Sequence, residues 1–243
     1  MSRSEGAASC DLAIAFDVES LEQAIRLDER LGEGPEFAKV GLQLFTAAGP
    51  EAVRALRARG RRVFLDLKLH DIPNTVQGAA AEVGRLGAEL LTVHATGGAE
   101  MVAAAVAGIA QSGGPTGVVA VTLLTSLDER NLPPGFARPF ALHGVVSELL
   151  EMSLRAGARG IVCSAGDLPG VRQRHPAPFY AVTPGIRPAG EGAQDQKRVT
   201  TVTDAVLMGS SLLVLGRAVT AASDPRAALE AVRAERDRAL ASA

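Results

Sequence analysis

The stretch RVFLDLKLHDIPNT, residues 62–75, decides the fold class and carries the charges on which the functional prediction depends. In a β-strand, successive side chains point to opposite faces. One face of residues 62–69 is wholly apolar and is expected to pack under helices: Val63, Leu65, Leu67 and Leu69. The other face carries Phe64, Asp66 and Lys68, with both charges at the carboxyl end of the strand. Charges at that end are typical of barrel active sites.

On either side of this stretch, short apolar runs alternate with helical patterns. Eight runs are predicted to be strands: residues 12–18, 37–42, 62–69, 90–95, 117–124, 160–164, 179–183 and 212–215. Helical spacing follows several of them, and the last helix has Ser223 or Asp224 as its N-cap before Pro225. Eight strands alternating with helices predict a (β/α)8 TIM barrel. A doubly wound open sheet is the alternative architecture.

Length and composition narrow the class of protein. The 243 residues, 47% of them apolar, are expected to form one domain over 1–243, with an irregular N-terminus at residues 1–10. The net charge of −2 gives no general attraction to nucleic acid or to an anionic membrane, and a content of 3% aromatic residues argues against base stacking. Neither kind of partner is therefore expected. Residues 1–10 lack an apolar signal core and no apolar run is long enough for a membrane span, so a cytoplasmic location is expected.

Neighbouring strands are predicted to bring further charges beside Asp66 and Lys68. Asp17 ends the first predicted strand, Lys39 faces inward near the end of the second, and Asp71 follows the third. An isolated Asp-x-Lys would be explained by a structural ion pair that closes the barrel end. A row of alternating carboxylates and ammonium groups keeps every member ionised and is hard to justify by stability alone. The row therefore favours a reaction centre.

The segment DLKLHDIPNTV, residues 66–76, resembles the signature of the orotidine 5'-monophosphate decarboxylase family. Further motifs are similar in the same order along nearly the whole chain: AFD at 15–17, KVG at 39–41, LTS at 124–126, TPGIR at 183–187, DQKRV at 195–199 and GR at 216–217. The resemblance implies decarboxylation of orotidine 5'-monophosphate to UMP and carbon dioxide, the last step of de novo pyrimidine nucleotide synthesis. It implies no metal and no organic cofactor.

The resemblance also assigns roles to individual residues. Lys68 is implied as the proton donor to C6, with Asp66, Asp71 and Lys39 completing the catalytic charges. Lys39 also binds the ribose hydroxyls together with Asp17. The residues matching Asp71 and Thr75 reach the neighbouring subunit's site, which implies a homodimer with shared active sites.

The remaining implied positions bind the pyrimidine and the phosphate. Thr125 and Pro184 match pyrimidine-site positions. The phosphate is expected at four residues: Arg187, Gln196, Gly216 and Arg217. Barrel phosphate sites form after the seventh and eighth strands, and arginine offers forked donors, so the fold supports this assignment. The irregular residues 187–196 are expected to close over the ligand.

Two other functions remain open from the residues alone. Magnesium-dependent keto-sugar-phosphate decarboxylases and hexulose-phosphate synthases share the D-x-K-x-x-D pattern, although they need metal-binding carboxylates and differ at Ile72-Pro73-Asn74. A non-catalytic nucleotide-binding barrel would keep the phosphate residues but could lose Lys68 or Asp71.

Overall fold

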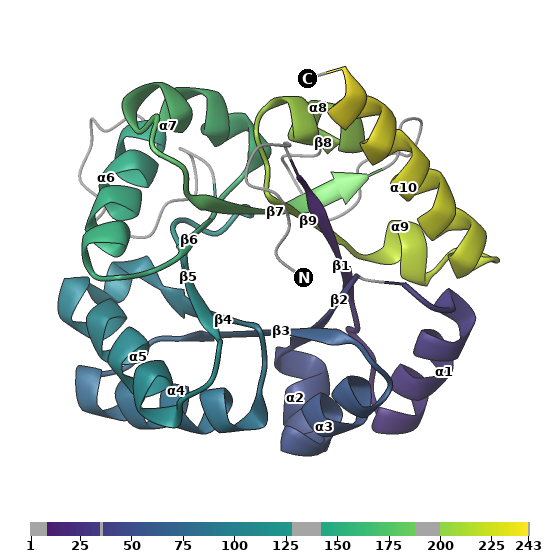
Figure 1. The fold of residues 1–243 in the computed structure, drawn as a ribbon, viewed down its shortest axis with the longest axis horizontal. Coiled ribbons are helices and arrows are strands. Elements are labelled where there is room, and N and C mark those ends of the chain that lie inside the picture. The colour runs from purple at the N-terminus through teal and green to yellow at the C-terminus, as the bar shows by residue number, and fades with distance from the viewer. Residues whose placement is uncertain (1–8, 35, 128–141, 188–199, 243) are drawn as a thin grey trace.

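The strands of the chain close into a barrel inside a ring of helices (Figure 1). The structure is a computed structural model that describes residues 9–34, 36–127, 142–187 and 200–242. The barrel strands are β1 Asp11–Ala15, β2 Phe37–Gly41, β3 Arg62–Leu69, β4 Leu90–His94, β5 Gly117–Val121, β6 Gly160–Val162, β7 Tyr180–Arg187 and β9 Leu212–Leu215. All neighbours pair in parallel, and β9 pairs with β1. This closure confirms the predicted barrel and excludes an open sheet.

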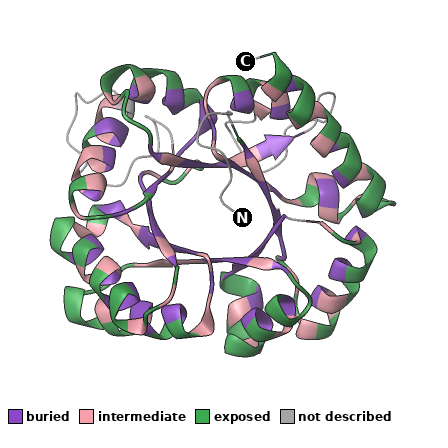
Figure 2. Ribbon diagram, viewed as in Figure 1, coloured by how far each residue is buried: buried purple, intermediate pink, exposed green. Residues whose placement is uncertain are grey.

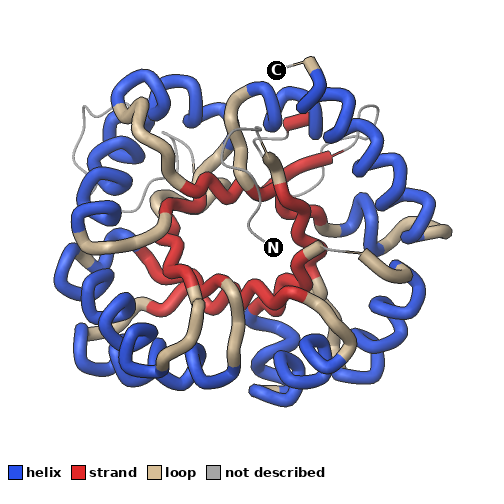
Figure 3. Tube along the Cα trace, in the orientation of Figure 1, coloured by secondary structure: helices blue, strands red, loops and turns tan. Residues whose placement is uncertain are grey.

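The helices lie outside the strands (Figure 3). They are α1 Leu21–Leu31, α2 Leu42–Ala48, α3 Pro50–Ala58, α4 Pro73–Leu86, α5 Ala99–Ser112, α6 Leu142–Arg155, α7 Leu168–Arg174, α8 Val202–Leu207, α9 Arg217–Thr220 and α10 Pro225–Ala241, with 3-10 turns η1 Ala95–Gly97 and η2 Ala165–Asp167. Local signals explain where they begin. The Asp224 side chain accepts from the backbone N–H of Ala227, and Pro225 opens α10. No helix in the described ranges is long and apolar enough to cross a membrane.

Several strands end earlier than predicted, at the end of the barrel that carries the charges. The ladder of β1 stops at Ala15, so Asp17 lies just beyond it rather than at its end. The apolar runs continue past the last paired residues, where Phe16 is still buried but Leu42 and Leu124 are largely exposed. In contrast, β7 runs on to Arg187, where it also pairs with the short strand β8, Thr200–Thr201.

Two apolar layers fill the molecule. Between the strands and the helices lie outward-facing side chains such as Val63 and Leu65, as the alternation in β3 predicts. The barrel interior is filled by a second cluster, with fully buried members from different strands: Ala13, Phe37, Phe64, Leu90, Val119, Val182 and Leu212. Figure 2 shows the resulting pattern of buried strands and helices exposed on their outer faces.

Charged residues close the amino-terminal end of the barrel. The guanidinium of Arg62 lies 3.9 Å from the centre of the Phe37 ring and forms ion pairs with Asp11 and Glu89 at 3.3 and 3.0 Å. The hydroxyl of Tyr180 donates to the same Asp11 carboxylate. The barrel is therefore a packed core with free space at its carboxyl end, the usual position of barrel active sites.

Candidate active site

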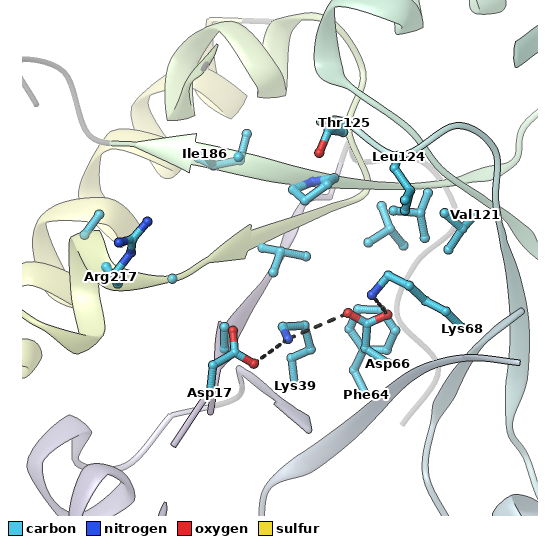
Figure 4. A pocket seen from close by; sticks show the side chains of 18 of the residues that line it. Asp17, Lys39, Phe64, Asp66, Lys68, Val121, Leu124, Thr125, Ile186 and Arg217 are labelled. Atoms are coloured by element: carbon cyan, nitrogen blue, oxygen red, sulfur yellow. Dashed lines mark hydrogen bonds and ion pairs between the residues drawn. The ribbon is translucent and has the colours of Figure 1, made fainter. Parts of the chain in front are cut away.

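The carboxyl ends of the strands surround a cavity of about 360 Å³ (Figure 4). Phe64 and Val182, members of the interior cluster, also line it, so the apolar core lies directly beneath. The cavity brings together most of the residues that the sequence predicts for the site: Asp17, Lys39, Asp66, Lys68, Thr125, Pro184, Arg187, Gly216 and Arg217. Gln196 lies outside the described residues.

One wall of the cavity carries a continuous row of alternating charges. The ammonium nitrogen of Lys39 lies 3.0 Å from Oδ1 of Asp17 and 3.7 Å from Oδ2 of Asp66. The ammonium of Lys68 donates to Oδ1 of Asp66 at 2.8 Å. The row follows the order of the strands, because Asp17 comes after β1, Lys39 lies in β2 and the other two lie in β3 (Figure 4).

Burial makes these charges interdependent. The side chains of Lys39 and Asp66 are 9% and 13% exposed, so neither ion is well hydrated. Burial alone would raise the pKa of Asp66. The ammonium groups of Lys39 and Lys68, together with hydrogen bonds from Lys68 and Thr92, hold this pKa below its ordinary value. Asp66 therefore remains ionised at neutral pH.

The charged row passes close to Gly41, which has no side chain to obstruct it. A Cβ atom on Gly41 would lie 2.9 Å from Oδ1 of Asp17 and 2.9 Å from Nζ of Lys39. Any larger residue there would push apart the two groups that form the closest contact at this end of the row. Gly41 thus belongs to the site, although it contributes no chemical group.

The strand that holds the central pair is irregular. Leu65 pairs with Leu91 and Leu69 with Val93, so the register shifts between these two positions. Within this bulge Lys68 has a φ of +52°, in the left-handed region, which costs an L-residue about 1–2 kcal/mol. The distortion aims the Lys68 side chain at the cavity, where it lies beside Asp66 (Figure 4).

Thr92 of β4 is a site residue that the sequence reasoning missed. Its hydroxyl accepts from the backbone N–H of Lys68 at 2.8 Å and donates to Oδ1 of Asp66 at 2.9 Å. Thr92 is fully buried. The signal available from the sequence was a polar residue on the inward-facing side of a strand, two positions before His94.

A cationic region lies across the cavity from Lys68. Gly216 and Arg217 follow β9, and Figure 4 shows Arg217 on the side opposite Lys68. Arg187 also lines the cavity at the end of β7 and is only 8% exposed. Within the described part of the chain, its guanidinium forms no hydrogen bond or ion pair. A buried cation of this kind is suited to an anionic ligand.

The remaining residues that line the cavity are mainly apolar. They include Phe64, Val121, Leu123, Val162, Val182, Pro184, Ile186 and Val214, with the hydroxyl of Thr125 at the rim. A flat, largely apolar ring fits against these walls, while its charged substituents would face the charged row and the arginines.

Asp71 and Thr75 do not line the cavity of their own chain. Both are exposed, and the Asp71 carboxylate accepts from the backbone N–H of Ile72 at 2.7 Å. Ile72 itself is 67% exposed, which is unusual for a large apolar side chain. The segment from 71 to 75 thus presents both polar and apolar groups to the outside of the chain.

Two histidines lie beside the row. The rings of His70 and His94 are 5.2 Å apart. Burial lowers the pKa of His94, and the neighbouring His70 and Lys68 lower it further. Among the described residues, no group of three or more His, Cys, Asp or Glu side chains is arranged to hold a metal ion.

The fold and the cavity together define a barrel enzyme with a buried lysine–aspartate row at one side and an anion-binding end at the other. The chain belongs to the Orotidine 5'-phosphate decarboxylase / HUMPS family, whose model matches residues 11–232.

Individual relatives agree with this assignment. The chain is 46% identical over 225 residues to an orotidine 5'-phosphate decarboxylase of Parasynechococcus marenigrum, covering 90% of this chain and 91% of the relative. It is 45% identical over 220 residues to the protein of the same name from Cutibacterium acnes, covering 90% and 93%. A crystal structure of orotidine 5'-phosphate decarboxylase from Lactobacillus acidophilus superposes with a TM-score of 0.82, at 36% identity, covering 94% of this chain and 100% of that one.

Proposed function

We propose that this chain decarboxylates orotidine 5'-monophosphate to UMP and carbon dioxide, with Lys68 as the proton donor. The observation that carries the proposal is the row from Asp17 to Lys68 on one wall of a cavity with Arg187 and Arg217 on its other side. The substrate has the matching arrangement, with a carboxylated ring at one end and a phosphate at the other.

The difficulty of the reaction explains why fixed charges are needed. When the bond between C6 and the carboxylate breaks, the electron pair stays on C6 in the plane of the ring, where the π system cannot delocalise it. A preorganised cation beside C6 stabilises this developing carbanion. The Lys68 ammonium supplies that charge and then gives its proton to C6, which leaves neutral lysine, UMP and carbon dioxide.

Asp66 has two effects in this proposal. Its carboxylate accepts from Lys68 at 2.8 Å and so orients the ammonium. Its low pKa also keeps a negative charge beside the position that the substrate carboxylate would occupy. Because carbon dioxide is neutral, repulsion between these carboxylates is relieved as the bond breaks.

The rest of the substrate uses the remaining cavity residues. Asp17 and Lys39 bind the ribose hydroxyls, and Thr125 and Pro184 contact the pyrimidine. The phosphate binds Arg187, Arg217 and the backbone at Gly216, with Gln196 as a further expected ligand. Binding energy from the phosphate, which does not react, supports catalysis at C6. The chemistry is assigned entirely to side chains and requires no metal or organic cofactor.

The functional unit in this proposal is a homodimer with shared active sites. Asp71 and Thr75 are exposed and lie outside the cavity of their own chain, as expected of residues that complete a neighbour's site. The exposed Ile72 between them would be buried by such an interface. Asp71 would then extend the charge row of the partner subunit.

The direct test is the loss of orotidine monophosphate absorbance with purified, metal-free protein. We expect turnover that a chelator leaves unchanged, whereas loss of activity in the chelator would favour a magnesium-dependent sugar-phosphate enzyme. Lys68→Ala should abolish turnover while UMP still binds through the phosphate contacts. Tight UMP binding by the wild-type protein without any turnover would instead identify a non-catalytic nucleotide-binding barrel.

A further inference from the structure

We infer that Thr92 is a positioning residue that fixes the Lys68 ammonium for proton transfer. The inference rests on the proposed function, because it concerns the geometry of the proposed donor. Thr92 does not line the cavity, so it acts through its neighbours rather than on the substrate.

The backbone of β3 explains why Lys68 needs support. Residues 66–68 stand opposite Thr92 alone, since the flanking pairs are Leu65 with Leu91 and Leu69 with Val93. Among described residues other than glycine, Lys68 alone has a positive φ, at +52°. Such a conformation is disfavoured for an L-residue and persists when surrounding contacts hold it.

The hydroxyl of Thr92 supplies two of those contacts in a fixed direction. A backbone N–H can only donate, so the Lys68 N–H at 2.8 Å makes Oγ1 an acceptor. An ionised carboxylate can only accept, so the single hydroxyl proton must point to Oδ1 of Asp66 at 2.9 Å. Because Thr92 is fully buried, bulk water does not compete for either bond.

The two hydrogen bonds control both ends of the lysine. One holds the main chain from which the Lys68 side chain starts, and the other holds the carboxylate with which its ammonium pairs. The same Oδ1 atom of Asp66 accepts from the Thr92 hydroxyl and from the Lys68 ammonium. Removing the hydroxyl thus takes away one hydrogen bond to the Lys68 backbone and one hydrogen bond to the carboxylate that positions the Lys68 ammonium.

A displacement of this kind affects the chemical step more than substrate binding. Proton transfer and charge stabilisation depend on reacting atoms about 3–3.5 Å apart, and a shift of about 1 Å can reduce the rate roughly 10²-fold. UMP lacks the carboxylate and is bound in the proposal mainly by the phosphate and ribose contacts. A purely structural role for Thr92 would instead reduce the amount of folded protein and affect both properties together.

The test compares Thr92→Val, which keeps the shape of the side chain but removes the hydroxyl, with Thr92→Ser, which keeps the hydroxyl. Thr92→Val should lower kcat about 10- to 100-fold, with UMP affinity and KM within about threefold of wild type. Thr92→Ser should retain at least about a third of kcat, since both hydrogen bonds remain available. Hydrogen exchange at the Lys68 amide should accelerate in the valine variant and stay slow in the serine variant.

Thr116→Val is the matched control. Thr116 is also buried, and its hydroxyl donates to the backbone carbonyl of Ala88, away from the cavity. This variant should lose stability without a change in kcat. If Thr92→Val does not fold, Thr92→Ala replaces it in the same comparison with serine.

Three results would overturn the inference: normal kcat without the hydroxyl, parallel losses of kcat and UMP affinity, or equal impairment of the serine and valine variants. Absence of orotidine monophosphate turnover in the wild type would refute the proposed function itself. Normal wild-type turnover with an unaffected Thr92→Val variant would refute the role of Thr92 alone.

Discussion

Lys39 and Asp66 lie in directly neighbouring strands, and the 3.7 Å contact between Nζ and Oδ2 joins two ion pairs into one row. Without it, the pair of Asp17 and Lys39 and the pair of Asp66 and Lys68 would be separate features of the barrel mouth. The contact thus couples the proposed ribose-binding residues to the proposed proton donor.

Lys39→Met tests this coupling because it keeps a long apolar stem and removes the charge. Lys39 is the strongest of the charges that hold down the pKa of Asp66, so that pKa should rise. We expect kcat/KM to fall about 10²- to 10³-fold, as when one preorganised electrostatic donor is removed, and its acid limb to move to higher pH. A pH–rate profile measures both effects.

Arg226→Met is the control for loss of a positive charge. The Arg226 side chain is 67% exposed and pairs with Glu230 on α10. Its removal should leave the profile unchanged. Near-normal activity of Lys39→Met, with the acid limb in place, would contradict the coupling.

Arg187→Met should change the stability of the ligand-free protein and its affinity for UMP in opposite directions. Arg187 as a residue is 8% exposed, and its guanidinium has no partner among the described residues, so no described group offsets the burial of this charge when ligand is absent. The substitution should raise the Tm of the ligand-free protein. UMP affinity should fall roughly 10- to 100-fold, since a hydrogen bond to a charged group contributes about 1.5–3 kcal/mol.

Calorimetry with UMP and with uridine checks the phosphate assignment. Uridine lacks the phosphate, so it should bind wild type and Arg187→Met equally. Equal UMP affinity in the two proteins would remove Arg187 from the phosphate site.

Shared active sites predict complementation between two inactive variants. Asp71→Ala and Lys68→Ala, refolded together, should regain about one quarter of wild-type activity. Random pairing makes about half of the dimers mixed, and each mixed dimer has one intact site out of two. The matched control combines Asp66→Ala with Lys68→Ala, which damage the same side of the site and should give no rescue. Failure of the first mixture, despite proven subunit exchange, would argue that each chain forms its site alone.

The order of apolar runs and helical patterns was enough to predict the barrel, and the alternation of side chains within strands was enough to predict the charged wall. The placement of Phe64 inside the barrel, and of Val63 and Leu65 against the helices, follows directly from the period of two. The order of the charges along the row also follows, because parallel strands bring their carboxyl ends together. The ends of the strands could not be predicted in this way, because an apolar run continues in the sequence after the backbone hydrogen bonding of the strand has stopped.

The support of Lys68 could not be predicted from the alternation. A bulge depends on the register between two strands, and a run of alternating residues does not reveal where one strand gains residues over its neighbour. In the sequence, nothing distinguishes Thr92 from other inward-facing residues, and only the register between β3 and β4 shows that it lies opposite the bulge. Gly41 gives a similar case, because its role depends on side chains that approach it from other positions.

His94 predicts a loss of stability on acidification. Its pKa lies below 6.5 in the folded state through burial and through the neighbouring His70 and Lys68. Above pH 6.5 the residue is neutral in both states, whereas below it the unfolded chain binds the proton first. The free energy of unfolding should therefore decrease as the pH falls from about 6.5 toward the lowered pKa.

Urea unfolding at pH 7.5 and 5.5, values chosen about one unit either side of an ordinary histidine pKa, measures this dependence. His94→Gln should show a smaller loss of stability between them than wild type, whereas His175→Gln, away from the cavity, serves as the control for removing a histidine. If wild type and His94→Gln lose the same free energy of unfolding between the two pH values, His94 is not the cause of the acid destabilisation.

Ser153→Ala is expected to stabilise the protein. Ser153 on α6 is fully buried, and its hydroxyl has no hydrogen-bond partner in the described structure. An unsatisfied buried group costs about 1–3 kcal/mol, and alanine is also the better helix former. The Tm should rise about 2–4 °C for each kcal/mol recovered, with unchanged kcat.

Ser112→Ala provides the opposite control, because the Ser112 hydroxyl donates to the Ile109 carbonyl and accepts from the Gly114 N–H. That variant should melt at a lower temperature than wild type. A lower Tm for Ser153→Ala as well would show that the Ser153 hydroxyl is satisfied in solution.

The stack of Arg62 on Phe37 and the ion pairs of Arg62 close the amino-terminal end of the barrel in the described part of the chain. The candidate cavity is therefore entered from the carboxyl end, because packed side chains of the described residues fill the barrel axis beneath it. While a nucleotide fills this mouth, the described residues leave no second route along the axis by which solvent could reach Lys68. In the proposed reaction, the product would therefore leave through this mouth, and the neutral Lys68 would regain its proton at the same end of the barrel.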